Sequence, residues 1–265
     1  MSGTLTIMRL SRYIGLAFMP FLFIGSGCAD VTNQRIQTVV VAPAWTSVDQ
    51  GIERIALSAQ FASSTHIIAY AFSPEDYVFR FTFSTSSQFV SGWQKTVPES
   101  VAAFNGAFFH EDQYPSGTLI TQGVSVGTRS FDTDKSGLLD LAPIARIVDG
   151  VNQDLNAAPG REAAQSFPML VRDRQPSVLT ESGKTARRTF AAERDDGAIV
   201  LGVVTDGTLT LYQLAHDLAR RELRLRTALN LDGGPSSGMS VHLPIWQEVS
   251  DSLTPIPISI IVIPK

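Results

Sequence analysis

The chain has 265 residues, of which 44% are hydrophobic and 17% are charged, so it can fold around a full core. This composition excludes intrinsic disorder as the main state. The chain carries 21 basic and 25 acidic side chains and a net charge of -4, which disfavours nucleic-acid binding because such proteins carry a basic excess. The single cysteine, Cys28, excludes an intramolecular disulfide and a CxxC zinc site.

The N-terminal segment predicts export. Two arginines and no acid precede an apolar run at 14–24, which is shorter than the roughly 20 residues that a membrane-spanning helix needs. Small residues at 25–27 then lead to Cys28, an arrangement that resembles a bacterial lipobox, although Gly25 stands where leucine is preferred. An ordinary cleaved signal, in which Cys28 has no role, is the alternative.

We therefore expect a lipoprotein-type signal peptide at 1–27, a linker at 28–35 and one domain at 36–265. The mature protein would be exported to the bacterial cell envelope and held to a membrane through a lipid on Cys28. Without disulfides, such a domain depends on its core for stability.

After the linker, the pattern predicts many short strands. Tyr77, Phe79, Phe81 and Phe83 place an aromatic side chain at every second position, as in a half-buried strand. A stretch at 127–160 is rich in Asp, Gly and Asn and predicts an insertion or a long irregular segment. The predicted strands and apolar runs are 38–41, 54–58, 66–72, 77–84, 101–109, 118–126, 168–172, 188–193, 198–205, 225–231, 239–243 and 256–263.

The clearest helix is predicted at 210–223, where Leu211, Leu214, Ala215 and Leu218 form an apolar stripe at helical spacing. Strands outnumber helices and do not alternate with them, which argues against a doubly wound or barrel α/β fold. The sequence therefore predicts an α+β class: a single domain with a mostly antiparallel or mixed sheet and a few helices.

The first polar segment of interest lies within an apolar run. Asn105 and Gly106 form a pair that usually marks a turn, yet they stand inside the apolar run 101–109. A buried Asn amide needs partners, so Asn105 either braces the backbone or points into a pocket. A structural β-bulge is the alternative reading.

The second segment joins Arg188 and Thr189 to an apolar strand that ends at Asp206. A guanidinium group has a planar fork that suits carboxylate or phosphate oxygens. Asp206 and Gly207 form a turn pair, and the carboxylate could be held at the rim of a sheet. Solvated charges at strand ends are the alternative.

The third segment, 228–239, is the most informative. Asn230 and Asp232 are expected to share one face by strand alternation. Gly233 and Gly234 can bring backbone N–H groups close to a ligand, and Ser236 and Ser237 add hydroxyl groups. A decorated hairpin turn is the alternative.

Gly234 to Gly238 also match the G-x-S-x-G pattern of the nucleophile elbow of α/β-hydrolases. The elbow requires a helix after its serine, whereas a β-like run follows here, and no Asp lies between Ser236 and His242. The four histidines show no H-x-x-x-H spacing, so a metal site is not predicted.

Taken in series, these segments resemble the phosphodiester glycosidase family, the family of the N-acetylglucosamine-1-phosphodiester α-N-acetylglucosaminidases. The resemblance covers about 66–263, and the last motif is the most specific. The chain departs from the usual family motifs at Ala107, His110, Phe167, Phe190-Ala191-Ala192 and Gln213. The matching motifs are Asn105-Gly106-Ala107-Phe108-Phe109-His110, Gln165-Ser166-Phe167-Pro168-Met169-Leu170-Val171, Arg188-Thr189-Phe190-Ala191-Ala192, Thr205-Asp206-Gly207, Leu209-Thr210-Leu211-Tyr212-Gln213-Leu214-Ala215 and Asn230-Leu231-Asp232-Gly233-Gly234-Pro235-Ser236-Ser237-Gly238-Met239.

The resemblance implies an envelope hydrolase that cleaves a glycosyl phosphodiester, with a phosphorylated carbohydrate as substrate. The leaving phosphomonoester has a second pKa of about 6, so holding the anion is a harder task than protonating the leaving group. The expected catalytic residues are Asp232 and Asp206, one as base or nucleophile and one as orienter, with Arg188. The expected substrate-binding residues are Asn105, Gly106, Thr189, Asn230, Gly233, Gly234, Ser236 and Ser237.

Two other functions fit part of this pattern. A non-catalytic lipoprotein that binds anionic glycans such as teichoic acid or exopolysaccharide needs the Arg and Ser donors but not the carboxylates. A conventional glycoside hydrolase that acts on a neutral sugar does not need Arg188 in the site. No cofactor is expected. A divalent cation near the acids is an alternative, although no ligand spacing indicates one.

Overall fold

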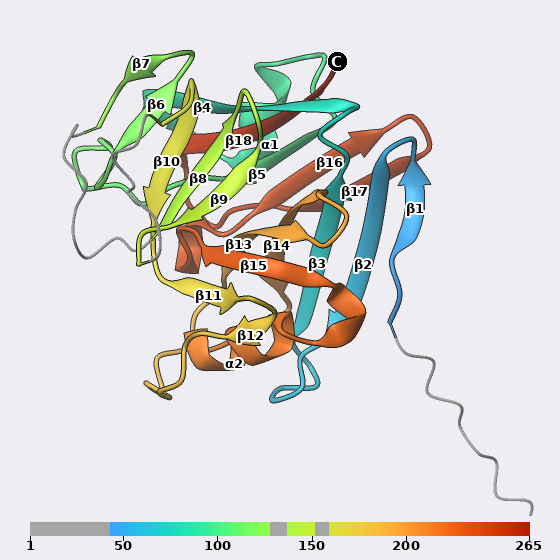
Figure 1. Cartoon of the computed structure of the whole chain (residues 1–265). Helices are drawn as coiled ribbons and strands as arrows, with labels where there is room; N and C mark the ends of the chain where they lie inside the picture. Colours follow the sequence, from blue (N-terminus) through green and yellow to red (C-terminus); the bar gives the residue numbers. More distant parts are fainter. Residues whose placement is uncertain (1–42, 128–136, 152–158) are drawn as a thin grey trace, which may run out of the picture. The chain divides into compact units, whose positions relative to one another are not determined.

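Three antiparallel sheets form the framework of residues 43–127, 137–151 and 159–265, which are the residues that this computed structural model describes (Figure 1). The expected signal, the linker, Cys28 and the strand at 38–41 lie outside the described residues. Within them, all paired strands run antiparallel.

The largest sheet has eight strands in the order β1-β2-β3-β14-β13-β15-β11-β12. All seven residues of β14 are buried, because both faces of this sheet are covered. Such strands read as continuous apolar runs rather than as alternating patterns. The strands are β1 Thr46–Asp49, β2 Ile52–Ser58, β3 His66–Phe72, β11 Met169–Arg172, β12 Gln175–Pro176, β13 Thr189–Arg194, β14 Ile199–Thr205 and β15 Leu225–Asn230.

A second sheet of five strands has the order β17-β16-β5-β18-β4. The strand that the aromatic alternation predicts at 77–84 is confirmed as part of β4. Tyr77, Phe79 and Phe81 are buried, and Phe83 packs against the same core. The strands are β4 Tyr77–Gln88, β5 Ala102–Asn105, β16 Met239–Leu243, β17 Trp246–Ser250 and β18 Ile256–Pro264.

The third sheet has the order β7-β6-β10-β8-β9 and contains two strands where the sequence predicted an irregular segment. That prediction was wrong for β8 and β9, because the polar Asp140 hides the strand pattern. Its carboxylate is buried and forms an ion pair of 3.1 Å with Arg146 on the neighbouring strand. The strands are β6 Leu119–Thr121, β7 Val124–Ser125, β8 Gly137–Ala142, β9 Arg146–Asp149 and β10 Glu162–Ser166.

The helices are short. Helix α2, Leu211–Leu218, begins at Thr210, whose side chain and that of Gln213 form a reciprocal capping box. It ends earlier than predicted, because Leu223 is buried through a separate 3₁₀ turn, η1 Arg221–Leu223. The other elements are α1 Val90–Lys95 and η2 Gly234–Ser236.

The apolar side chains form two large clusters. One is shared by the three sheets, and the other lies between the eight-stranded sheet and α2, which packs beside β11 and β12 (Figure 1). No helix of the described residues is long and apolar enough to cross a membrane. The expected antiparallel sheets are confirmed, but the class is mainly β rather than α+β, since the described helices are few and short.

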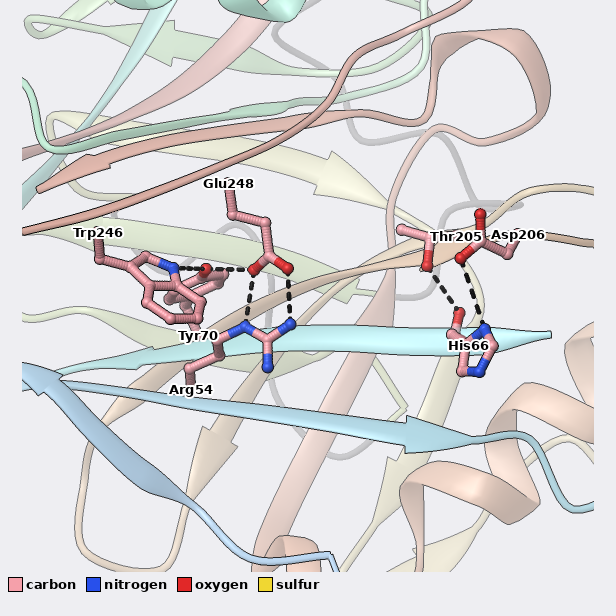
Figure 2. A network of polar contacts seen from close by, with 7 residues as sticks. All are labelled: Arg54, His66, Tyr70, Thr205, Asp206, Trp246 and Glu248. Atoms are coloured by element: carbon pink, nitrogen blue, oxygen red, sulfur yellow. Dashed lines mark hydrogen bonds and ion pairs between the residues drawn. The ribbon is translucent and has the colours of Figure 1, made fainter. Parts of the chain in front are cut away.

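A polar network joins the first two sheets through Glu248 of β17 (Figure 2). Arg54 of β2 donates two hydrogen bonds to this carboxylate, of 2.7 and 2.6 Å, and Tyr70 of β3 donates a third. Trp246 donates its ring N–H to the Tyr70 hydroxyl at 2.8 Å. Burial opposes ionisation of Glu248, but Arg54 and Tyr70 outweigh it and hold the pKa of this carboxyl below its usual value.

We expect Glu248→Gln to lower the free energy of unfolding by about 1–3 kcal/mol, because Arg54 loses its charged partner in a half-buried position. Urea denaturation at pH 7 would measure this, with the exposed Glu75→Gln as the matched control. The lowered pKa of Glu248 stabilises the fold only while this carboxyl is ionised, so its contribution is lost as pH falls through the folded-state pKa. The stability difference between the wild type and Glu248→Gln should therefore shrink in acid. Equal stability of the Glu248 and Glu75 variants at pH 7 would contradict this role.

Candidate functional site

Asn105, at the end of β5, joins three segments that lie far apart in the sequence. Its side-chain oxygen accepts hydrogen bonds from the Thr189 hydroxyl at 2.6 Å and from the Gly238 N–H at 2.9 Å. Its amide nitrogen donates to the backbone carbonyl of Asp232 at 2.8 Å. Because Asn105 is only 1% exposed, these contacts meet the need of a buried amide for partners.

Gly106 holds the same loop through its backbone. Its carbonyl accepts a hydrogen bond from the N–H of Asp232 at 3.2 Å, and its own N–H donates to the backbone carbonyl of Ile258 at 3.1 Å. A β-carbon at Gly106 would lie 2.8 Å from the Ile258 side chain, which is closer than packing permits. A glycine is therefore required for β5 and β18 to approach at this point.

The loop after β15 turns tightly through η2. Gly234 has a φ of +62°, which glycine adopts without strain, and its N–H donates to the carbonyl of Arg187 at 2.8 Å. The Gly233 N–H donates to the Asp232 side chain at 2.8 Å. Strand β15 ends at Asn230, so the expected strand alternation does not extend to Asp232. The loop geometry, rather than a shared strand face, sets where this carboxylate lies.

Asp232 has an unusual acidity for an aspartate. Its side chain is half-buried, and this burial raises the pKa of Asp232 to about 6, although the Ser236 side chain and the Gly233 N–H act in the opposite direction. A carboxyl with such a pKa exchanges its proton readily near neutral pH, as a general base or acid must.

Arg188 lies beside this loop. A β-carbon at Gly233 would be 3.9 Å from Cδ of Arg188. The guanidinium donates to the backbone carbonyls of Leu209 at 3.0 Å and Lys184 at 2.9 Å, and burial lowers its pKa. Among the described residues, no carboxylate forms an ion pair with it, so its charge is left for another anion.

Asp206 lies apart from this hydrogen-bonded group. Its side chain is 76% exposed, and its carboxylate is 3.5 Å from Nδ1 of His66 (Figure 2). Its backbone φ of +44° marks the expected turn after β14. Burial lowers the pKa of Arg187, and the negative charge of Asp206 partly offsets this effect. The described hydrogen bonds and ion pairs join Asp206 to His66 and none of them joins it to Asp232.

Two buried polar atoms near the loop have no hydrogen-bond partner in the described part of the chain. They are Oδ1 of Asn230 and the hydroxyl oxygen of Ser237, in residues that are 3% and 0% exposed. The amide nitrogen of Asn230 is occupied, since it donates to the carbonyl of Phe167 at 2.9 Å. Because unpaired buried polar atoms are rare, both are candidate ligand contacts.

The other chemistries that the sequence raised can be compared with the structure. Ser236 is followed by strand β16 and not by a helix, so the context of a nucleophile elbow is absent from this part of the described chain. Across residues 43–127, 137–151 and 159–265, no three His, Cys, Asp or Glu side chains are grouped so that they could hold a metal ion.

Arg187 and Gly238 have structural roles that the sequence patterns did not indicate. Arg187 donates to the carbonyl of Asp251 at 3.3 Å and to the Ser250 hydroxyl at 3.2 Å, and its carbonyl holds Gly234. A β-carbon at Gly238 would lie 2.5 Å from the backbone nitrogen of Ser252. The consecutive pair Arg187-Arg188 stands just before β13, and nothing in the sequence assigns the two arginines different roles.

The comparisons with known proteins agree with this motif series. A family model for phosphodiester glycosidases matches residues 98–263, more than half of the chain. The catalytic domain of zebrafish N-acetylglucosamine-1-phosphodiester alpha-N-acetylglucosaminidase, auto-inhibited by its pro-peptide, is similar with a TM-score of 0.59 and 17% identity, over 84% of this chain and 86% of that one.

A hypothetical protein from Synechocystis is similar with a TM-score of 0.56 and 13% identity, over 86% of this chain and 64% of that one. A comparison with curated protein sequences found no match. Identities this low show a shared fold, and the match to the family model adds the family. The chain therefore belongs to the phosphodiester glycosidase family.

Proposed function

We propose that this protein hydrolyses a glycosyl phosphodiester, with Asp232 as its principal carboxylate. The observation that carries the proposal is the set of hydrogen bonds through Asn105, which gathers three distant motif segments around the Asp232 loop. Asp232, whose pKa is about 6, lies in this loop. The aliphatic part of Arg188, which has no carboxylate partner among the described residues, packs beside Gly233 of the same loop.

In the proposed reaction, ionised Asp232 takes a proton from a water molecule as that water attacks the anomeric carbon of the sugar. The bond from this carbon to the phosphate oxygen breaks, and the phosphomonoester leaves with the electron pair. Arg188 and the Ser237 hydroxyl stabilise the anion, because such donors favour charge that is already present or develops in the transition state. The N–H groups of Gly233 and Gly234 shape the loop instead, through the Asp232 side chain and the Arg187 carbonyl.

The remaining predicted site residues receive supporting roles in this proposal. The unpaired Oδ1 of Asn230 can accept a hydrogen bond from a sugar hydroxyl, and the unpaired Ser237 hydroxyl can donate one to a sugar or phosphate oxygen. Asn105 and Thr189 act as positioning residues, since their described hydrogen bonds are to each other and to the loop backbone. Asp206 stays in the proposal only as the second carboxylate of the motif series, since its side chain is 76% exposed and lies beside His66. The proposal uses these side chains alone and invokes no cofactor.

Two rival functions fit the site less well. A module that only binds anionic glycans would gain nothing from a half-buried carboxylate beside its anion donors, because Asp232 would repel the ligand once ionised. A hydrolase for a neutral sugar leaves Arg188 without a carboxylate or phosphate to bind. The raised pKa of Asp232, and the absence of a carboxylate partner for Arg188 among the described residues, therefore support hydrolysis of an anionic substrate.

The proposed base role predicts a specific pH dependence. Between pH 5 and 7, kcat/KM should rise about tenfold and then level off, because the raised pKa of about 6 leaves most of Asp232 protonated at pH 5. The measurement is phosphomonoester release from a panel of synthetic sugar phosphodiesters. Each rate is measured with and without EDTA, which removes divalent cations and should leave the rate unchanged. A rate that falls through pH 6 would show that Asp232 acts as an acid, and no release from any diester at any pH would contradict the hydrolase.

We also propose that the chain is exported and anchored through Cys28, on the basis of the N-terminal pattern. In a bacterial host, the wild-type protein should incorporate labelled palmitate and partition with membranes. The Cys28→Ser variant should lose both properties, because a serine hydroxyl does not replace the modified thiol. Palmitate incorporation that survives this substitution would contradict the lipid anchor.

A further inference from the structure

A cavity of about 610 Å³ lies where the β11–β12 hairpin meets the segment that follows α2. This volume is within the range of sites for small molecules. Arginine is its most frequent lining residue, in a chain whose net charge is -4. The lining residues are Arg174, Gln175, Pro176, Asp195, Ala219, Arg220, Arg221, Arg224 and Leu225.

The lining carries surplus positive charge. Arg174 forms an ion pair of 2.6 Å with Asp195, and Arg220 forms one of 2.6 Å with Glu222. Within the described ranges, Arg221 and Arg224 have no ion pair, and both side chains are exposed. The acids at this cavity are therefore engaged with Arg174 and Arg220, and two guanidinium groups remain to bind an anion.

The backbone places two of these arginines in an uncommon conformation. Arg174 has a φ of +64° and Arg224 a φ of +57°, in the left-handed region where glycine and asparagine are favoured. Both positions are fixed by hydrogen bonds: Arg174 N–H to the Arg226 carbonyl at 3.0 Å, and Asp195 N–H to the Arg224 carbonyl at 2.9 Å. The chain thus keeps a long cationic side chain where a smaller residue would fit the backbone better.

We propose that this cavity is a binding site for a phosphate group, separate from the Asp232 loop. Guanidinium groups bind phosphate oxygens with two parallel hydrogen bonds, and several of them from different segments can surround one group. Arg221 and Arg224 are its principal ligands, and Arg174 and Arg220 add to the positive field. A soluble sugar phosphate and a phospholipid headgroup share this chemistry. The inference does not rest on the proposed hydrolysis.

Isothermal titration calorimetry with inorganic phosphate and glucose 1-phosphate tests the site. The variant Arg188→Gln is the starting protein, so that binding beside Asp232 is weakened in every sample. Adding Arg221→Gln and Arg224→Gln should weaken phosphate binding at least about tenfold, because both unpaired guanidinium groups are lost. The matched control is Arg161→Gln, an exposed arginine outside the lining. Circular dichroism checks folding, and Arg221→Gln alone replaces the double change if that variant unfolds.

A flotation assay distinguishes the two sources of phosphate. Vesicles of phosphatidylglycerol and phosphatidylcholine should retain the expected mature chain from residue 28, with Cys28→Ser to exclude a lipid anchor, if a headgroup occupies the site. Vesicles of phosphatidylcholine alone should not retain it. Retention that depends on Arg221 and Arg224 assigns the headgroup, whereas binding of glucose 1-phosphate without retention assigns a soluble ligand. Absence of binding to every probe, or equal binding by the variant and the Arg161 control, would overturn the proposal.

Discussion

Replacement of Asp232 by asparagine should lower kcat/KM for a sugar phosphodiester by about 100- to 10,000-fold, the usual contribution of a general base. The amide has nearly the shape of the carboxyl and keeps an acceptor for the Gly233 N–H, which lies 2.8 Å from Oδ1. It cannot take a proton from water. The measurement is a comparison of steady-state rates of phosphomonoester release, and wild-type activity in this variant would refute the catalytic role.

The stability of this variant provides an independent control. Burial raises the folded-state pKa of Asp232 from 3.8 to about 6, so ionisation between these values favours the unfolded chain. The wild-type protein should lose about 1–3 kcal/mol of stability from this group as pH rises from 4 to 7. The asparagine variant has no such loss, so its stability relative to wild type should increase over that range in urea denaturation. An inactive variant that is also less stable at pH 7 would indicate misfolding instead.

Replacement of Asn105 by leucine should lower both stability and activity. The change leaves the Thr189 hydroxyl, the Gly238 N–H and the Asp232 carbonyl without their partner in a position that is 1% exposed. Unpaired buried groups of this kind cost about 2–4 kcal/mol together. Because Asn105 holds the loop that carries Asp232, a displacement of about 1 Å should also reduce kcat about 100-fold.

Thr189→Val is the matched control for this prediction, since it removes one hydrogen bond of Asn105 and leaves the bond to the Asp232 carbonyl. We expect it to cost about 1 kcal/mol and to retain most of the activity. Urea denaturation measures the stability of both variants, and the rates are measured far from their unfolding transitions. If Asn105→Leu keeps its wild-type kcat while it is destabilised, Asn105 has a structural role only.

Local patterns were sufficient to predict many of the strands. The predicted strand at 66–72 coincides with β3, and the alternation of Tyr77, Phe79 and Phe81 correctly identified the buried face of β4. These segments succeed because period-two alternation or an uninterrupted apolar run reports burial directly. Strands β8 and β17 were missed, since Asp140 and Glu248 interrupt the apolar pattern with acids that are neutralised by arginines on other strands.

The candidate site was predictable as a set of motifs but not as an arrangement. The polar residues inside apolar runs identified Asn105, Thr189 and Asp232, which the hydrogen bonds of Asn105 join. The sequence treated Asp206 and Asp232 as a pair, whereas the structure places Asp206 on an exposed turn beside His66. Arg187 could not be separated from Arg188 before the contacts of Arg187 with Asp251 and Gly234 were known.

By itself, the sequence determined the family, many of the strands and the residue types available for anion chemistry, since all of these are encoded in local spacing. The tertiary structure alone decided that Asn105 holds the Asp232 loop, that burial raises the pKa of Asp232, and that arginines from separate segments line one cavity. Hydrogen bonds, desolvation and summed charge depend on distances in space between residues that are far apart along the chain.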